Sequence, residues 1–269
     1  MLLIIEALLL ISSALGRDHR DDDKIYILDK ALNSVDDQYD GCRKNMKKDV
    51  ETKYLENELN TSPDFKKAWN RGKASVKPPY DILSENHEIA IFVYSDDVHS
   101  EIYKDFNSDS RIGKERYRNK NYKWYSLYFL LTEAIQILKS KTEQKNKCLS
   151  TYRGTDVKFK ENVLNTEVRF GSFVSSSSSR ESAQNFGRKS CFEIETCEGA
   201  DVTKYSAFPN EEEVLIPPYE MFKVTKVRTR KDDKNLWCET VFTLKKNKKM
   251  SNLNCAVAQK DKSLNLYSY

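Results

Sequence analysis

The chain has 269 residues, 39% hydrophobic and 32% charged, which is enough for one globular domain with a core of its own. Its formal net charge is only +4, so composition does not indicate a nucleic-acid-binding protein, and three His without a CxxC pair give little support to a metal site. We expect a single domain over residues 17–269, with no nucleic-acid partner and no metal.

The first 16 residues, MLLIIEALLLISSALG, form an apolar run that is too short for a comfortable membrane span. Ala14 and Gly16 follow at the spacing of a cleavage site, which predicts a signal peptide over residues 1–16. Glu6 within the run is unusual, and the alternative is a buried N-terminal helix. The C-terminal KDKSLNLYSY lacks the hydrophobic tail that directs a glycolipid anchor. We therefore expect a secreted, extracellular chain without a stable membrane anchor.

Residues 31–147 have a mostly helical pattern. Apolar side chains recur at three and four residues from Trp124 to Leu138, which predicts one buried helix. The segment IAIFVYS, Ile89 to Ser95, is the exception. Because it is short, β-branched and aromatic, we expect it to enter a sheet.

After Cys148 the sequence consists of short apolar runs separated by turn residues, which predicts a β-rich half. In SCFEIETC, apolar and acidic residues alternate as in a strand with one buried face. The segment KKNKK, residues 245–249, predicts a solvated turn between late strands. From Lys223 to Lys262 there are twelve Lys and Arg against four Asp and Glu, and we interpret them as the solvated edges of these strands.

Six cysteines are spread along the chain, an even number that predicts disulfides in an oxidising compartment. Spacing alone leaves fifteen connectivities open. Asn60-Thr61-Ser62 is a glycosylation sequon, which agrees with passage through the secretory route.

The stretch FPNEEEVLIPPYEMF, residues 208–222, sets three carboxylates against an apolar run. Because Val, Leu and Ile favour an extended chain, we expect Glu211 and Glu213 to project from one face of a strand while Glu212 points away. Two carboxylates on a rigid strand suit a reaction that develops positive charge, such as cleavage of a glycosidic bond. The alternative, which the pattern alone favours, is an acidic solvated turn.

Three separated segments together resemble a known signature: YRG at Tyr152–Gly154, FVSSS at Phe173–Ser177 and EEEVLIPPYEMF at Glu211–Phe222. They look like the Arg, Ser-x-Ser and Glu-x-Glu motifs of the vertebrate ecto-ADP-ribosyltransferases, and the similarity extends over about residues 36–255. The resemblance implies an α+β, ADP-ribosyltransferase-like fold, with a helical N-terminal half packed on a C-terminal β-sandwich core that contains an NAD cleft. It also implies transfer of ADP-ribose from NAD, or alternatively NADP, to arginine side chains of acceptor proteins, with release of nicotinamide and without metal.

The resemblance assigns the cofactor-binding residues. Arg153 would bind the phosphates of NAD, since a guanidinium donates paired hydrogen bonds. Gly154 would let the backbone approach the nicotinamide amide. Ser177 would be the second serine of its motif, and Phe186 is a candidate to stack on the nicotinamide ring.

The catalytic roles also follow from the resemblance. Ser175 would hold the strand geometry and the catalytic glutamate. Glu213 would bind NAD through a hydroxyl of the nicotinamide-side ribose. It would also stabilise the oxocarbenium. Glu211 would receive the acceptor guanidinium and help to deprotonate it; without it, water would be the acceptor.

The resemblance further implies disulfides Cys42–Cys255 and Cys148–Cys197, the second of which would clamp the helical half to the β half. Cys191 and Cys238 would then pair with each other or leave a free thiol. Two alternative functions stay open: an NAD glycohydrolase, and a non-catalytic secreted binding protein on the same scaffold that uses its basic segment to hold acidic surfaces.

Overall fold

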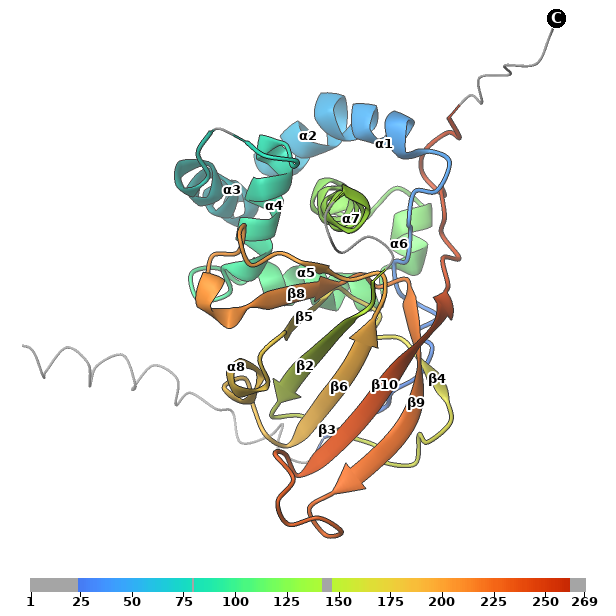
Figure 1. The fold of residues 1–269 in the computed structure, drawn as a ribbon. Helices are drawn as coiled ribbons and strands as arrows, with labels where there is room; N and C mark the ends of the chain where they lie inside the picture. The colour runs from blue at the N-terminus through green and yellow to red at the C-terminus, as the bar shows by residue number, and fades with distance from the viewer. Residues whose placement is uncertain (1–23, 79, 142–146, 262–269) are drawn as a thin grey trace, which may run out of the picture.

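The structure, a computed structural model, describes residues 24–78, 80–141 and 147–261 (Figure 1). The predicted signal peptide lies outside the described residues. No helix among the described residues is long and apolar enough to cross a membrane.

Helices α1 to α7 all lie in the first half of the chain and gather on one side of a large sheet, as the predicted helical half requires (Figure 1). A single π-helical turn, η2, joins α1 to α2. Their bounds are α1 Arg43–Asp49, η2 Val50–Tyr54, α2 Leu55–Thr61, α3 Pro63–Ser75, α4 Glu85–Ser95, α5 Ile102–Arg111, α6 Lys114–Arg118 and α7 Tyr125–Lys141.

The predicted helix near residues 124–138 is confirmed as α7, the central helix of this layer. Leu127, Leu131 and Ala134 are fully buried in the main hydrophobic core. Glu58 of α2 accepts hydrogen bonds from the backbone nitrogen and the hydroxyl of Ser126, and so occupies the N-terminal turn of α7. Burial raises the pKa of Glu58 to about 8.

The strand expected at Ile89–Ser95 is wrong, because this segment is part of α4. Ser84 and His87 form reciprocal side-chain contacts that cap its start. Ile89, Ala90, Ile91, Val93 and Tyr94 are all buried. A helix covered around most of its circumference is apolar without a 3.6-residue period, so its sequence resembles that of a buried strand.

The second half of the chain forms one mixed eight-stranded sheet, in the order β4-β9-β10-β6-β2-β5-β8-β7, and a separate pair, β1 with β3. The α+β class is therefore confirmed. The pairing of β2 with β5 rests on a single residue pair, Tyr152 with Ser177, at the point where the sheet changes direction (Figure 1). The strands are β1 Ile25–Tyr26, β2 Leu149–Thr155, β3 Lys158–Phe159, β4 Glu167–Val168, β5 Val174–Ser177, β6 Ser190–Thr196, β7 Ala200–Asp201, β8 Glu213–Ile216, β9 Glu220–Thr229 and β10 Thr240–Lys249.

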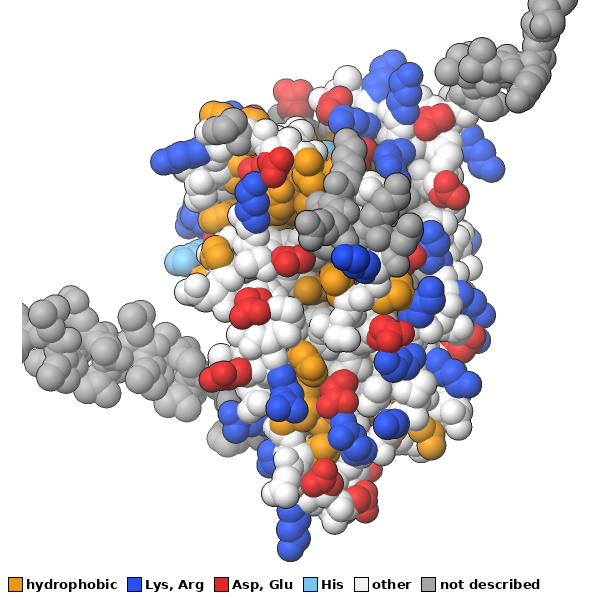
Figure 2. Space-filling model, viewed as in Figure 1, with side chains coloured by type: hydrophobic (Ala, Val, Ile, Leu, Met, Phe, Trp, Pro, Cys, Tyr) orange, Lys and Arg blue, Asp and Glu red, His pale blue; other side chains and the backbone are white. Residues whose placement is uncertain are grey.

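The turn expected at residues 245–249 is wrong, because these lysines continue β10. Acidic side chains of β6 and β4 form salt bridges with them: Lys245 pairs with Glu195 at 2.8 Å and Lys248 with Glu167 at 3.1 Å. Figure 2 shows basic and acidic side chains interspersed over this face. The basic segment is therefore a solvated face of mixed charge.

All six cysteines form disulfides: Cys42–Cys255, Cys148–Cys197 and Cys191–Cys238. Both implied pairings are confirmed, and the remaining two cysteines pair. The clamp expected from the second bond is wrong, however. Cys148 directly precedes β2 and Cys197 directly follows β6, so the bond joins two neighbouring strands.

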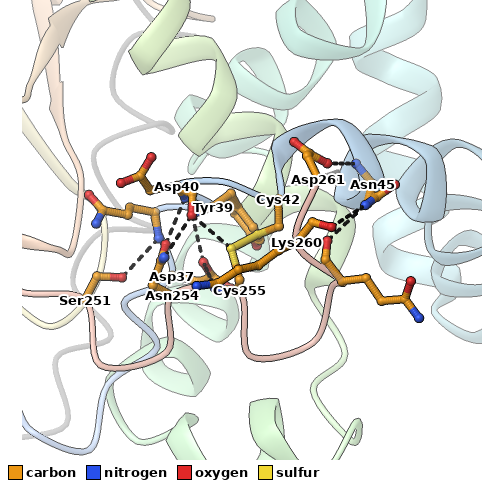
Figure 3. Close-up of a disulfide and its surroundings, with 12 residues drawn as sticks. Asp37, Tyr39, Asp40, Cys42, Asn45, Ser251, Asn254, Cys255, Lys260 and Asp261 are labelled. Atoms are coloured by element: carbon orange, nitrogen blue, oxygen red, sulfur yellow. Dashed lines mark hydrogen bonds between the residues drawn. A yellow bond between two sulfur atoms is a disulfide. The ribbon is translucent and has the colours of Figure 1, made fainter. Parts of the chain in front are cut away.

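The first disulfide is part of a clamp between the two ends of the described chain (Figure 3). The carboxylate of Asp261 accepts hydrogen bonds from the backbone nitrogens of Lys44 and Asn45 at the start of α1. The Asn45 amide in turn donates to the carbonyl groups of residues 259 and 260. The C-terminal segment is thus fixed to the first helix.

Candidate active site

A cavity of about 180 Å³ lies where the helical layer meets β2, β5 and β8. All seven predicted site residues line it, although they come from the three motif segments and, for Phe186, from a fourth place in the chain. Its lining comprises Ser95, Asp97, Tyr103, Tyr152, Arg153, Gly154, Thr155, Ser175, Ser176, Ser177, Ala183, Phe186, Glu211 and Glu213.

Arg153 lies on β2 and contributes to the lining of this cavity. Its Nη1 donates to the carbonyl oxygen of Ser175 at 2.5 Å, across the junction between β2 and β5. Tyr103 of α5 also lines the cavity. The remaining N–H groups of the fork are available to an anionic ligand.

Gly154 is required by the close approach of helix α8, Arg180–Gln184. A Cβ at Gly154 would lie 2.3 Å from the Ala183 carbonyl oxygen and 2.4 Å from that of Gly187, so no side chain fits. This packing accounts for the glycine whether or not a ligand approaches. Phe186, just beyond α8, lines the cavity with 49% of its surface exposed.

The serine run forms strand β5, in register with β8, so that Ser175 lies opposite Leu215 and Ser177 opposite Glu213. The Ser177 hydroxyl donates to the Glu211 carbonyl oxygen at 2.7 Å. The second serine of the motif therefore fixes the backbone that carries the acidic residues.

The strand expected to carry both Glu211 and Glu213 is wrong in its first part. Pro209–Glu211 is a 3₁₀ turn, and Glu212 adopts a left-handed conformation with φ 49°, so β8 begins only at Glu213. The left-handed conformation of Glu212 changes the direction of the chain. The alternation of residues along a strand does not predict such a change. Both Glu211 and Glu213 still line the cavity, while the Glu212 carboxylate is exposed and accepts from Ser178 at 2.7 Å.

Glu213 is the most buried acid of the cavity, with 4% of its surface exposed. Ser206 donates to its Oε2 at 3.0 Å, whereas Oε1 has no hydrogen-bond partner. Burial raises the pKa of Glu213, and the hydroxyls of Ser175 and Ser206 act in the opposite direction. The free oxygen is a ready acceptor for a hydroxyl group of a ligand.

Glu211 lies nearer the mouth of the cavity. Partial burial, followed by the charges of Glu213 and Asp97, raises its pKa to about 7. A carboxyl group of this pKa exchanges a proton readily at neutral pH, which suits a general base.

Three residues of this arrangement were absent from the predicted site: Asp97, Tyr103 and Ser206. Asp97 and Tyr103 come from the segment around α5, about fifty residues before the first motif, and no local pattern marks them. Ser206 lies seven residues before Glu213, and its only signal is a hydroxyl close to the acidic run. No group of three or more metal-binding side chains occurs in the described ranges.

Comparison with known proteins agrees with this architecture. The sequence model of the family described as NAD:arginine ADP-ribosyltransferase matches residues 28–251. NAD(P)(+)--arginine ADP-ribosyltransferase 2 of Gallus gallus is 33% identical over 239 residues, which are 85% of this chain and 72% of the relative. T-cell ecto-ADP-ribosyltransferase 1 of Mus musculus is 32% identical over 253 residues, which are 90% of this chain and 82% of the relative.

A further relative is matched over less of its length. GPI-linked NAD(P)(+)--arginine ADP-ribosyltransferase 1 of Mus musculus is 34% identical over 212 residues, and the match spans 73% of this chain but only 64% of the relative. Among solved structures, the eukaryotic mono-ADP-ribosyltransferase ART2.2 superimposes with a TM-score of 0.72 at 32% identity, over 86% of this chain and 99% of ART2.2. Two variants of ART2.2 were crystallised in complex with NADH and with NAD. From its motifs, its fold and these matches, the chain belongs to the NAD:arginine ADP-ribosyltransferase family.

Proposed function

We propose that the protein is an extracellular enzyme that transfers ADP-ribose from NAD to arginine side chains of proteins and releases nicotinamide. The observation that carries the proposal is the buried, unpartnered Oε1 of Glu213 in a cavity that also contains Arg153, Ser175 and Glu211. Membership of the family supports it. Three disulfides support an extracellular location, where such bonds persist.

NAD would extend along both sides of Arg153. A second cavity of about 820 Å³ also includes Arg153 and Thr155 in its lining. We assign the nicotinamide and its ribose to the smaller cavity, beside Phe186, and the adenosine to the larger one. The guanidinium of Arg153 would then hold the diphosphate between them.

Cleavage would break the bond between nicotinamide and the ribose carbon, with the electron pair leaving on nicotinamide. The ribose becomes positively charged as this bond lengthens, and Glu213 is the most buried carboxylate in the lining of the cavity. Its Oε1 would accept the hydrogen bond of a ribose hydroxyl and stabilise the oxocarbenium. Because the carboxylate is already desolvated and held by Ser206, little reorganisation is needed during the reaction.

The acceptor guanidinium would then attack the ribose carbon through one nitrogen and lose a proton to Glu211. The raised pKa of Glu211, about 7, allows it to take up that proton at neutral pH. If Glu211 does not hold an arginine, water enters in its place and the reaction is NAD hydrolysis. NADP remains a candidate donor, which competition with labelled NAD would test.

The test is incubation with NAD labelled in its adenosine part and an arginine-rich acceptor protein. Wild-type protein should give a protein-bound label that hydroxylamine removes. Glu213→Gln should reduce this labelling by about 10²–10³-fold, the usual effect of removing a group that stabilises transition-state charge.

The matched control is Glu212→Gln, since Glu212 is the adjacent acid but faces Ser178 outside the cavity. It should label the acceptor at nearly the wild-type rate. Equal labelling by wild type and Glu213→Gln would reject the catalytic proposal, and absence of labelling and of nicotinamide release from wild type would favour a non-catalytic binding protein.

A further inference from the structure

The turn that follows α4 brings an additional acidic side chain to the cavity. Asp97 lines it together with Glu211 and Glu213. In the described part of the chain, the Asp97 carboxylate forms no salt bridge and no hydrogen bond with another side chain. Its charge adds to the effect of burial in raising the pKa values of Glu211 and Glu213.

The preceding residue fixes this turn. Asp96 is 3% exposed, and its Oδ2 accepts from Nε and Nη2 of Arg71 at 3.1 and 2.8 Å. His99 Nδ1 lies 2.6 Å from its Oδ1. Asp96 is thus fully used in holding the turn, and Asp97, which has no such partners, is free to serve a ligand.

A second contact joins the turn to the loop that carries the catalytic acids. The hydroxyl of Ser95, at the end of α4, accepts from the backbone nitrogen of Ala207 at 2.8 Å. The preceding residue of that loop, Ser206, donates to Glu213. The wall of the cavity formed by α4 and the wall that leads to β8 are therefore held together.

The balance of charge in the cavity favours a cationic ligand. Three carboxylates line it against one cation, Arg153, which the proposed function assigns to the diphosphate of NAD. The buried Oε1 of Glu213 lacks a donor. A guanidinium carries five N–H donors in one plane and can contact carboxylates on two sides at once.

We propose that Asp97 is an acceptor-specificity residue, whose carboxylate binds the guanidinium of the target arginine from the helical wall while Glu211 binds it from the opposite wall. This inference rests on the proposed function and deepens it. Asp97 orients the acceptor and takes no part in cleaving NAD.

The experiment compares wild type with Asp97→Asn, using N-acetylarginine amide as acceptor because its only charged group is the guanidinium. The KM for this acceptor should rise about fivefold to tenfold, as expected for loss of one charge-assisted hydrogen bond at a partly exposed site. The kcat and the rate of NAD hydrolysis without acceptor should stay within about twofold of wild type. Asp97→Glu should restore most of the acceptor affinity.

The control variant is Asp105→Asn, which removes one negative charge from the exposed face of α5, outside the cavity lining. If Asp97→Asn and Asp105→Asn have the same KM for the acceptor, the inference about Asp97 is overturned but the proposed function is not. A parallel fall in NAD hydrolysis would also overturn it, because Asp97 would then act on the donor or on folding. Wild-type protein that neither hydrolyses NAD nor modifies an acceptor would refute the proposed function, and this inference with it.

Discussion

Outside the cavity, the buried carboxylates of the described residues accept hydrogen bonds from nearby donors, whereas inside it one carboxylate oxygen is buried with no donor. Glu58 accepts from the backbone and side chain of Ser126, and Asp36 is paired with Arg169 at 2.7 Å. Oε1 of Glu213 is the only buried carboxylate oxygen without a partner in the described ranges. An unmet buried acceptor costs about 1–3 kcal/mol, so it persists where a ligand supplies the donor. The first group of acids maintains the fold, and the second is reserved for chemistry.

The largest expected effect comes from breaking a satisfied pair. Arg169→Met leaves Asp36 buried beside only one remaining donor, the backbone nitrogen of Leu253. The free energy of unfolding should fall by about 3–5 kcal/mol, because an uncompensated charge stays in the interior. Chemical denaturation measures it, with Arg228→Met as control.

Arg228 forms a similar pair with Glu193, but their side chains are 39% and 27% exposed. Arg228→Met should lower the free energy of unfolding by less than about 1 kcal/mol. If Arg169→Met and Arg228→Met lower the free energy of unfolding by similar amounts, burial does not make the Arg169–Asp36 pair more important for stability than the exposed pair.

An intermediate effect is expected from the acid at the mouth of the cavity. Glu211→Gln should reduce kcat/KM for an arginine acceptor by about tenfold or more while NAD hydrolysis continues. In wild type this kcat/KM should rise with pH around a midpoint near 7, because the raised pKa of Glu211 means that only higher pH supplies the carboxylate. In Glu211→Gln this rise should be absent; a variant that keeps it would show that another group titrates.

The smallest effect is expected on stability at the catalytic acid. Glu213→Gln removes a buried carboxylate that lacks a full set of donors, so the free energy of unfolding at neutral pH should stay within about 1 kcal/mol of wild type. Thermal unfolding of the two proteins provides the measurement. A loss of unfolding free energy above about 2 kcal/mol would show that Glu213 stabilises the fold as Glu58 and Asp36 do. The difference between Glu213 and these two acids would then not hold.

Much of the fold was accessible from sequence, because periodicity reports burial on one side. The stripe in α7 and the alternation in β6 are both visible in this way. Helix α4 could not be recognised in this way, because its apolar residues are buried around most of the helix. Its start signal, Ser84 with His87 three residues later, was also unusual, because a histidine replaces the usual Glu or Gln.

The site divides similarly. The motif residues were identified from a resemblance, and the structure brings them together in one cavity. Their backbone was predicted incorrectly at Glu212, where a left-handed residue is imposed by tertiary contacts of Ser177 and Ser178 with the loop. Asp97 could not be found because its placement depends on contacts with Arg71 and Ala207, which are distant in sequence.

The bond between Cys42 and Cys255 turns most of the polypeptide into a covalent ring, because 213 positions separate the two cysteines. Every residue that lines the cavity lies within this ring. Loop-closure entropy assigns such a ring on the order of 5 kcal/mol of stabilisation, through the unfolded chain. Outside the cell, one cut by a protease in a loop of the ring would leave both fragments attached, and only reduction would separate them.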